Sequence, residues 1–285
     1  NYFKRSITMN RFPDFLIVGA QKCGTSTLHN WLGSHPDCFL PEIKEPHYFS
    51  RFEPWKEIIE RNGIVRDTKS YTSLFSGALP NQLCGESSPS YLYEEGVAER
   101  IHSTIPECKI IISVRDPVAR ALSEYKMYVM AGLENRDFRT AIEASVDGVK
   151  KRSWSDYPLY LELSKYGSQV KRYYDVFPKN RIVIISLNEI ATESKLTMIQ
   201  ISEMLGICSK FWKSYKYPVT NAGRVPKNWL SKIILYSDNL RALGRIIVPR
   251  RFRQYIALNI FGKKSKNGLI NRYVRHSTHP DHWRI

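Results

Sequence analysis

The sequence predicts an α/β protein of three layers, in which a central, mostly parallel sheet is flanked by helices. Residues 15–19 have the sequence Phe-Leu-Ile-Val-Gly, and residues 109–114 and 181–187 are similar apolar runs. Short, continuous apolar runs of this kind are typical of parallel strands buried on both faces. Strand, tight loop and helix in repetition indicate helical crossovers between such strands. We therefore expect a ligand site beyond the carboxyl ends of the strands.

Four segments have the features of helices. Residues 25–32 place apolar side chains at helical spacing, and Pro117 suits the first turn of a helix that ends near Met130. Residues 159–177 and 194–205 are also expected to be helical. Each of these helices follows or precedes one of the apolar runs, as the three-layer arrangement requires.

The positive charge is concentrated at one end of the chain. The net charge is +16, and residues 209–285 contain 17 Lys and Arg against two acidic residues, Asp238 and Asp281. Such a segment indicates an anionic ligand, whether nucleotide, nucleic acid, acidic polysaccharide or membrane surface, or a merely solvated basic surface. We expect one domain over residues 1–285, with residues 1–11 as a flexible segment and residues 209–285 as its basic C-terminal region.

Five scattered cysteines contain no Cys-x-x-Cys pair, which argues against a metal site and against a dense disulfide framework. A reducing compartment is the simpler interpretation, and no run approaches the 18 apolar residues of a membrane span. We expect a cytoplasmic location, or the Golgi lumen if a membrane anchor precedes this chain.

The segment after the first apolar run has the composition of an anion-binding loop. Gly19 and Gly24 allow the backbone to approach an anion, and the backbone N–H groups at the start of the next helix form an anion site. A simple strand-to-helix turn needs one glycine and a cap, but it does not need a lysine and three hydroxyl groups. The expected contacts are Lys22, Cys23, Gly24, Thr25, Ser26 and Thr27.

This loop differs from that of ATPases and GTPases. Their motif places the lysine directly after the second glycine. Here Lys22 precedes Gly24, and Thr25 occupies the lysine position. A small-molecule kinase is therefore the weaker alternative.

Residues 15–49 as a whole resemble the opening of the carbohydrate sulfotransferases, particularly the heparan sulfate enzymes and their bacterial relatives. The similarity extends over about residues 12–206. It implies a P-loop-like fold and transfer of a sulfuryl group from PAPS (3′-phosphoadenosine 5′-phosphosulfate) to an acceptor hydroxyl or amine, without a metal ion. It also implies that Lys22 stabilises the departing nucleotide.

The end of the second apolar run carries a second motif of this family. The resemblance implies that Arg115 and Ser123 bind the 3′-phosphate of PAPS, and a guanidinium suits a forked phosphate contact. The alternative is a capping loop, with Asp116 as the cap and Arg115 in a surface ion pair. A later glycine and basic segment resembles the part of the family that closes over PAPS, and its expected contacts are Gly223, Arg224 and Lys227.

Glu45 and His47 are the candidate general bases. In the heparan sulfate enzymes a glutamate at the position of Glu45 takes the proton of the acceptor, while His47 is either the rival base or a neighbour that orients Glu45. Both can also be ordinary exposed loop residues.

The acceptor is less defined than the donor. The heparan sulfate enzymes carry a lysine at the position of Ser87, and they can carry an aspartate at that of Ser50. These departures favour an acceptor of the broader bacterial group, with a saccharide, which can be anionic, as the expected partner. Glu86 is expected either to contact the acceptor or to form a cap or turn. The nucleic-acid alternative depends on aromatic residues that follow residue 209 and could stack on bases, namely Trp212, Tyr215, Tyr217, Trp229, Tyr236, Phe252 and Tyr255.

Overall fold

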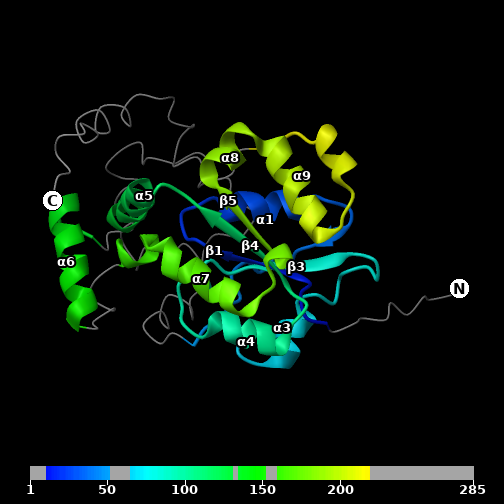
Figure 1. The fold of residues 1–285 in the computed structure, drawn as a ribbon, viewed down its shortest axis with the longest axis horizontal. Coiled ribbons are helices and arrows are strands. Elements are labelled where there is room, and N and C mark those ends of the chain that lie inside the picture. The colour runs from blue at the N-terminus through cyan, green and yellow to red at the C-terminus, as the bar shows by residue number, and fades with distance from the viewer. Residues whose placement is uncertain (1–10, 52–64, 131–133, 152–158, 219–285) are drawn as a thin grey trace, which may run out of the picture. The chain divides into compact units, whose positions relative to one another are not determined.

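The computed structural model describes residues 11–51, 65–130, 134–151 and 159–218 of the chain (Figure 1). Its strands form one sheet in the order β2-β3-β1-β4-β5, and every neighbouring pair is parallel. The predicted central parallel sheet is thus confirmed. The strands are β1 (Phe15–Gly19), β2 (Cys38–Phe39), β3 (Leu83–Ser87), β4 (Lys109–Val114) and β5 (Ile182–Ser186).

Alternate side chains of each central strand enter different cores, because successive residues of a strand point to opposite faces. In β1, Leu16 and Val18 belong to the first core and Phe15 and Ile17 to the second, and all four are fully buried. β4 and β5 divide their residues in the same way. Burial on both faces explains why these strands appear in the sequence as continuous apolar runs.

Helices cover both faces of the sheet and complete the three layers (Figure 1). On the first face lie α3 (Thr68–Ser73), α4 (Val97–Thr104) and α7 (Tyr166–Val176). On the second face lie α1 (Thr25–Gly33), α8 (Leu187–Thr192), α9 (Ser194–Leu205) and a 3₁₀ turn at Ser209–Lys213. Two further helices, α5 (Pro117–Met130) and α6 (Phe138–Lys151), share a small core with Tyr160.

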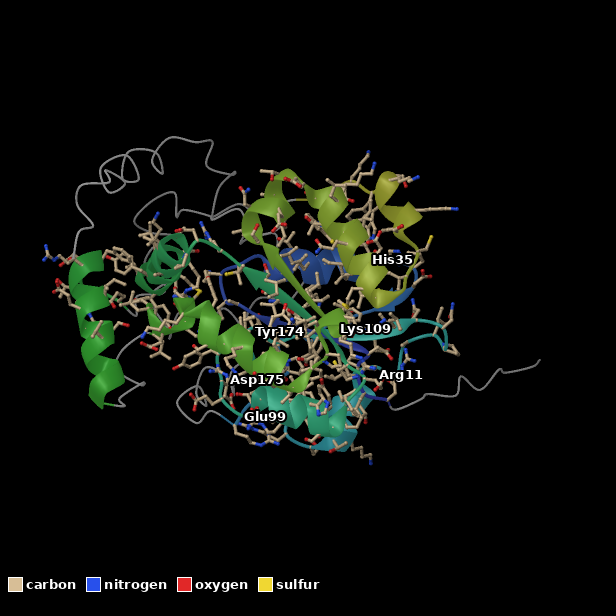
Figure 2. All side chains as sticks on the ribbon, viewed as in Figure 1. Arg11, His35, Glu99, Lys109, Tyr174 and Asp175 are labelled. Carbon is tan, nitrogen blue, oxygen red and sulfur yellow. The ribbon has the colours of Figure 1, made fainter. Side chains whose placement is uncertain are left out.

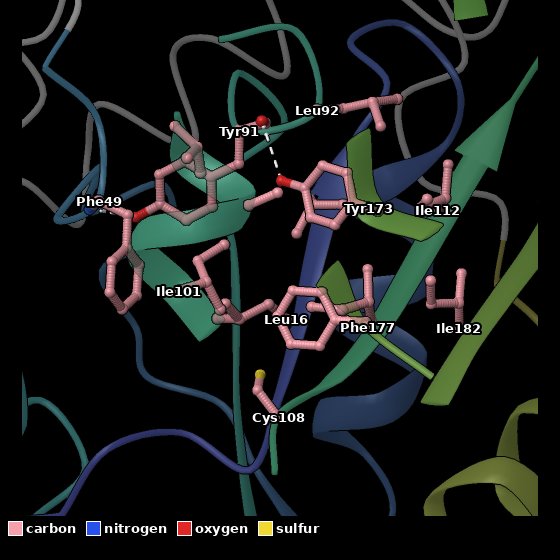
Figure 3. Close-up of a cluster of buried hydrophobic side chains, with 14 of the residues drawn as sticks. Leu16, Phe49, Tyr91, Leu92, Ile101, Cys108, Ile112, Tyr173, Phe177 and Ile182 are labelled. Carbon is pink, nitrogen blue, oxygen red and sulfur yellow. Dashed lines mark hydrogen bonds between the residues drawn. The ribbon is translucent and has the colours of Figure 1, made fainter. Parts of the chain in front are cut away.

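The first core joins the segment that follows β3 to the sheet and to α7 (Figure 3). The hydroxyl of Tyr173 on α7 donates to the carbonyl of Tyr91 at 2.9 Å, and both rings are buried. The backbone N–H of Leu92 donates to the carbonyl of Val18 at 2.7 Å. Residues 88–92 are therefore held against the end of β1, where the anion-binding loop begins.

The second core includes the first residues of the basic C-terminal region. Trp212 is fully buried, and its indole N–H donates to the hydroxyl of Ser202 at 2.6 Å. Tyr217 packs edge-on against Trp31 of α1, with ring centroids 4.9 Å apart. Tyr215 belongs to the same core. These three aromatic residues are structural, so they do not support the nucleic-acid alternative; the other four lie outside the described residues.

Most of the expected elements are confirmed, and two need correction. The helix predicted over residues 159–177 is a 3₁₀ turn at Glu162–Ser164 followed by α7. The guanidinium of Arg120 binds the carbonyl of Tyr160 and the hydroxyl of Ser164, which draws this segment toward α5 and breaks the helix. Residues 85–87 do not follow a strand but form the end of β3, so the turn or cap role considered for Glu86 is wrong.

All five cysteines carry free thiols, and four of them are buried. No helix within the described ranges has the length and apolarity needed to cross a bilayer.

Gly85 of β3 faces Phe15 of β1 so closely that a methyl group has no room there. A Cβ at this position would lie 2.1 Å from the Phe15 ring, whereas a Cβ at Gly167 of α7 meets nothing within 4 Å. We expect Gly85→Ala to lower the free energy of unfolding by about 1–3 kcal/mol through overpacking. Gly167→Ala should raise it by about 0.4–1 kcal/mol because it restricts the unfolded chain. Urea unfolding followed by circular dichroism measures both, and equal effects of the two variants would contradict the tight contact between β1 and β3.

Candidate active site

The loop between β1 and α1 presents an uncapped helix start at the carboxyl edge of the sheet. Gly24 is the N-cap of α1 in a left-handed conformation (φ 90°), and no side chain caps the helix. A Cβ at Gly24 would lie 2.8 Å from Leu187 of α8, so the position has two reasons to be glycine. The first N–H groups of α1 remain available to an anion, as the sequence predicted.

The loop is fixed from the side of β4. The hydroxyl of Ser113 donates to the carbonyl of Cys23, and the N–H of Ala20 donates to the carbonyl of Ser113 at 2.6 Å. The Cys23 thiol is buried and lies 3.5 Å from the hydroxyl of Tyr166, and burial raises the pKa of this thiol. Cys23 can therefore contact a ligand only through its backbone.

Lys22 has an unusual backbone conformation and a partly buried ammonium group. Its backbone is left-handed (φ 66°), and its ammonium group lies 3.4 Å from the sulfur of Met127 on α5. Within the described ranges, no carboxylate lies within ion-pair distance of this ammonium. Burial lowers the pKa of Lys22, the charge of Glu124 opposes this effect, and Arg115 adds to it. The negative charge of an anion bound here would offset both the cost of burying the ammonium charge and its repulsion by Arg115.

Arg115 and Ser123 lie on the neighbouring unit, formed by β4 and α5. Asp116 caps α5 by accepting a hydrogen bond from the N–H of Ala119 at 2.7 Å, so the capping role considered for it is correct. The surface ion pair considered for Arg115 is not present among the described residues. Its charge lowers the pKa of both Lys22 and Cys23, although burial is the larger influence on each group.

A buried ion pair lies within α5, next to Ser123 in the sequence. Arg120 and Glu124 are one helical turn apart, with 2.7 Å between guanidinium and carboxylate, and both side chains are almost fully buried. Burial raises the pKa of Glu124, and Arg120 opposes this effect. Arg120 also contacts Ser164 at 2.5 Å. Sequence analysis did not assign this pair, although its i, i+4 spacing was visible.

Glu45 and His47 lie in one segment, which hydrogen bonds to residues 87–91 hold in place. Both have left-handed backbones, with φ values of 62° and 53°. The N–H of Glu45 donates to the carbonyl of Ser87 at 3.1 Å, and the N–H of His47 donates to the hydroxyl of Ser88 at 3.2 Å. Two residues later the N–H of Phe49 donates to the hydroxyl of Tyr91 at 3.1 Å. The segment after β3 therefore fixes the conformation of the candidate base.

The two candidate bases differ in access. The Glu45 side chain is 36% exposed, whereas that of His47 is only 7% exposed. Nδ1 of His47 lies 2.8 Å from the hydroxyl of Ser90, and Nε2 lies 3.8 Å from the Glu45 carboxylate. Burial lowers the pKa of His47, and the charge of Glu45 opposes this effect. At neutral pH a neutral His47 thus lies behind an accessible Glu45, and His47 is not the exposed loop residue considered as the alternative.

Lys44, which sequence analysis did not assign, links the two parts of the site. Its ammonium group donates to the hydroxyl of Ser26 on α1 at 2.9 Å and contacts the Glu45 carboxylate at 2.5 Å. The charge of Glu45 also acts on Lys22. The Glu45 carboxylate is therefore linked through Lys44 to the start of α1. The only sequence signal for Lys44 was its position next to Glu45.

Left-handed backbones coincide with the predicted catalytic residues. Among the described residues, the three non-glycine residues with positive φ are Lys22, Glu45 and His47. Such conformations are uncommon for residues with a side chain, and they concentrate at functional sites. The backbone thus indicates the same residues that the sequence motifs do.

Glu86 lies beneath this segment and is fully buried at the end of β3. Neither carboxyl oxygen completes a hydrogen bond of normal geometry in the described part of the chain. Burial raises the pKa of Glu86 to about 8, while the nearby hydroxyls of Ser88, Tyr91 and Tyr71 oppose this effect. Glu86 therefore carries a proton at neutral pH. Full burial also excludes the direct acceptor contact that the sequence suggested for it.

Ser50 contacts a carboxylate that comes from a distant part of the chain, that of Glu94. The Ser50 hydroxyl donates to Glu94, which is buried and also accepts from the N–H of Arg51 at 2.6 Å. Arg100 pairs with the same carboxylate at 2.6 Å. Where the sequence lacks an acidic residue at position 50, the fold supplies Glu94.

Three predicted donor contacts, Gly223, Arg224 and Lys227, lie outside the described residues. Within the ranges that are described, no group of three or more His, Cys, Asp or Glu is arranged to hold a metal ion.

The fold and the site define an α/β protein with an uncapped strand-to-helix loop, linked through Lys44 to an accessible carboxylate. Comparison with known proteins gives the family: the chain belongs to the sulfotransferase domain family, which matches residues 12–221. The fold agrees with a sulfotransferase from Alicyclobacillus acidocaldarius, with a TM-score of 0.65 and 29% identity over 84% of this chain and 92% of that one. The family and its fold do not favour the kinase alternative.

Two curated relatives act on saccharides according to their names. Human heparan sulfate glucosamine 3-O-sulfotransferase 6 is 28% identical over 69% of this chain and 53% of its own length. Mouse carbohydrate sulfotransferase 15 is 24% identical over 68% of this chain and 44% of its own. The chain thus spans about half the length of the curated relatives it matches.

The protonated state of Glu86 predicts a specific dependence of stability on pH. Between about pH 4.5 and 8 the unfolded chain loses this proton while the folded chain keeps it, so the free energy of unfolding falls as the pH rises. Glu86→Gln lacks this effect. Its stability relative to the parent chain should therefore increase by roughly 3–4 kcal/mol between pH 5 and pH 8. Denaturant titrations at both pH values measure the difference, and parallel pH profiles would show that Glu86 ionises normally.

Proposed function

We propose that this protein transfers a sulfuryl group from PAPS to a hydroxyl or amine of a saccharide. The observation that carries the proposal is geometric: the ammonium group of Lys44 joins the Glu45 carboxylate, at 2.5 Å, to the hydroxyl of Ser26 at the start of α1, at 2.9 Å. An accessible carboxylate therefore lies near the loop that carries Lys22, and within the described ranges neither Lys22 nor Arg115 forms an ion pair. Sulfuryl transfer needs this set, because one group must accept a proton while others stabilise the leaving phosphate.

The residues present fit PAPS as the donor. The uncapped start of α1, with the hydroxyls of Thr25, Ser26 and Thr27, suits the phosphosulfate end. Arg115 at the end of β4 and Ser123 in α5 suit the 3′-phosphate. PAPS supplies an activated sulfuryl group. Lys22 stabilises negative charge on the phosphate oxygen as its bond to sulfur breaks.

Glu45 is the group that takes the proton of the acceptor. As the acceptor oxygen or nitrogen forms its bond to sulfur, its proton passes to the Glu45 carboxylate, and 3′,5′-adenosine bisphosphate leaves. His47 orients Glu45 from a buried position and is itself held by Ser90. Lys44 fixes the other carboxylate oxygen. The accessibility of Glu45 and the burial of His47 support this division of roles.

The names of the curated relatives support a saccharide acceptor. The presence of Ser87 where the heparan sulfate enzymes carry a lysine argues against carrying their particular substrate over to this chain. The proposal therefore extends to the class of acceptor and not to one polysaccharide.

The donor site can be tested by calorimetric titration with 3′,5′-adenosine bisphosphate in the absence of magnesium. We expect binding that weakens at least about a hundredfold in a Lys22→Ala, Arg115→Ala double variant, because two charge-assisted contacts are lost. Arg139→Ala is the control, since this arginine is 88% exposed on α6. No binding by the folded parent chain, or equal binding by the double variant, would overturn the proposal.

The base can be tested by transfer of labelled sulfate from PAPS to a panel of saccharides. Glu45→Gln should lower kcat by roughly 10²–10⁴ while the affinity for 3′,5′-adenosine bisphosphate stays unchanged. Glu42→Gln, an exposed residue of the same segment, should retain full activity. A normal rate in Glu45→Gln together with a lost rate in His47→Asn would instead assign the base to His47.

A further inference from the structure

A polar cavity of about 510 Å³ lies beyond the base segment, on the first face of the sheet. It is bounded by Arg51, by residues 93–95 and Arg100, and by the polar side of α7 and the turn before it. Helices α4 and α7, which contribute to it, lie side by side, as the labelled Glu99 of α4 and Tyr174 and Asp175 of α7 indicate (Figure 2). Its size is within the range of small-molecule sites, but its walls are far more polar than those of most such sites.

The charges in this cavity are only partly neutralised within it. Glu94 is paired with Arg100 at 2.6 Å, and Glu162 is paired with Lys165 at 2.5 Å. Glu95 is the third acidic residue of the lining. Two arginines, Arg51 and Arg172, have no carboxylate within ion-pair distance in the described part of the chain.

Both of these arginines are held in place by backbone carbonyls. The guanidinium of Arg51 donates to Tyr48 at 2.8 Å and to Ser50 at 3.0 Å. The guanidinium of Arg172 donates to Leu92 at 3.1 Å and to Tyr93 at 2.6 Å. Each keeps its positive charge and some of its five N–H donors for a ligand. Positioned guanidinium groups of this kind suit a carboxylate or sulfate group.

The cavity is joined to the base segment. Glu94 lies in its wall and holds the hydroxyl of Ser50 and the N–H of Arg51. Glu45 and Arg51 are six residues apart, which limits their Cα separation to about 20 Å. One oligosaccharide can therefore occupy the cavity with one unit and reach Glu45 with another.

We infer that this cavity binds an acidic unit of the saccharide acceptor, with Arg51 and Arg172 on its carboxylate or sulfate group. The inference rests on the proposed function. Glu95 and the paired carboxylates of the lining accept hydrogen bonds from sugar hydroxyls, and the arginines select the acidic group. A neutral saccharide leaves both guanidinium groups without a counter-charge, so it binds more weakly.

A short ligand tests this inference, because a disaccharide fits the cavity, whereas a long polyanion can bind any basic surface. The probe is a disaccharide of one hexuronate and one N-sulfated glucosamine, and cellobiose is the neutral comparison. Ligand-observed NMR titration is performed on the chain saturated with 3′,5′-adenosine bisphosphate. We expect the acidic disaccharide to bind at least tenfold more tightly than cellobiose.

Paired variants locate the binding. An Arg51→Gln, Arg172→Gln double variant should raise the dissociation constant of the acidic disaccharide about tenfold and leave that of the nucleotide unchanged. Arg172→Lys, which retains the charge, should have a smaller effect. Lys171→Gln is the matched control, because this lysine neighbours Arg172 on α7 but is 71% exposed and pairs with Asp175.

The inference is overturned if cellobiose binds as tightly as the acidic disaccharide, or if the double variant behaves like Lys171→Gln. Nucleotide binding in the same samples reports on folding and on the donor site. Nucleotide binding without selectivity for the acidic disaccharide refutes the cavity assignment alone. A parent chain that does not bind the nucleotide refutes the proposed function itself.

Discussion

The start of α1 must stay open to an anion, and much of the surrounding structure serves this requirement. A left-handed Gly24 leaves the first N–H groups of the helix uncapped, and the left-handed Lys22 turns the loop immediately before them. Glycine adopts this conformation freely, whereas it is unfavourable for Lys22. Ser113 therefore holds the loop from β4, while the buried Cys23 anchors it in the core. The site therefore consists mainly of backbone N–H groups in a loop that the rest of the fold holds in place.

The positive charge of Lys22 lies near other cations, and an acidic residue of α5 reduces the resulting repulsion. Burial lowers the pKa of Lys22, and the positive charges of Arg115 and Arg120 lower it further. Glu124 is buried beside Arg120 and also acts on Lys22, so it offsets part of this repulsion. Without it, three cations would remain around one loop. A buried pair of this kind adds little net stability by itself, but the loss of one partner leaves a costly unpaired charge.

The sequence predicted three of the five strands and the loop after β1, because these depend on local patterns, but it did not predict β2 or the end of β3. Continuous apolar runs identified β1, β4 and β5, and the position of Lys22 relative to Gly24 distinguished the loop from that of kinases. The short helix α8 was missed, although Ser186 and Glu189 form a capping box that was visible in the sequence. The break before α7 could not be predicted, since it depends on Arg120 reaching across from another helix.

Contacts between distant segments also explain why the acceptor side was less predictable than the donor side. The donor loop is one continuous stretch, whereas the base segment depends on hydrogen bonds to residues about 40 positions later. Position 50 illustrates the point. The sequence shows only a serine there, but in the fold its hydroxyl donates to the carboxylate of Glu94. Because Glu94 belongs to another segment, its carboxylate also contacts the backbone N–H of Arg51 and the guanidinium of Arg100. The same scaffold can thereby keep one donor chemistry while the surroundings of the base, and with them the acceptor, change.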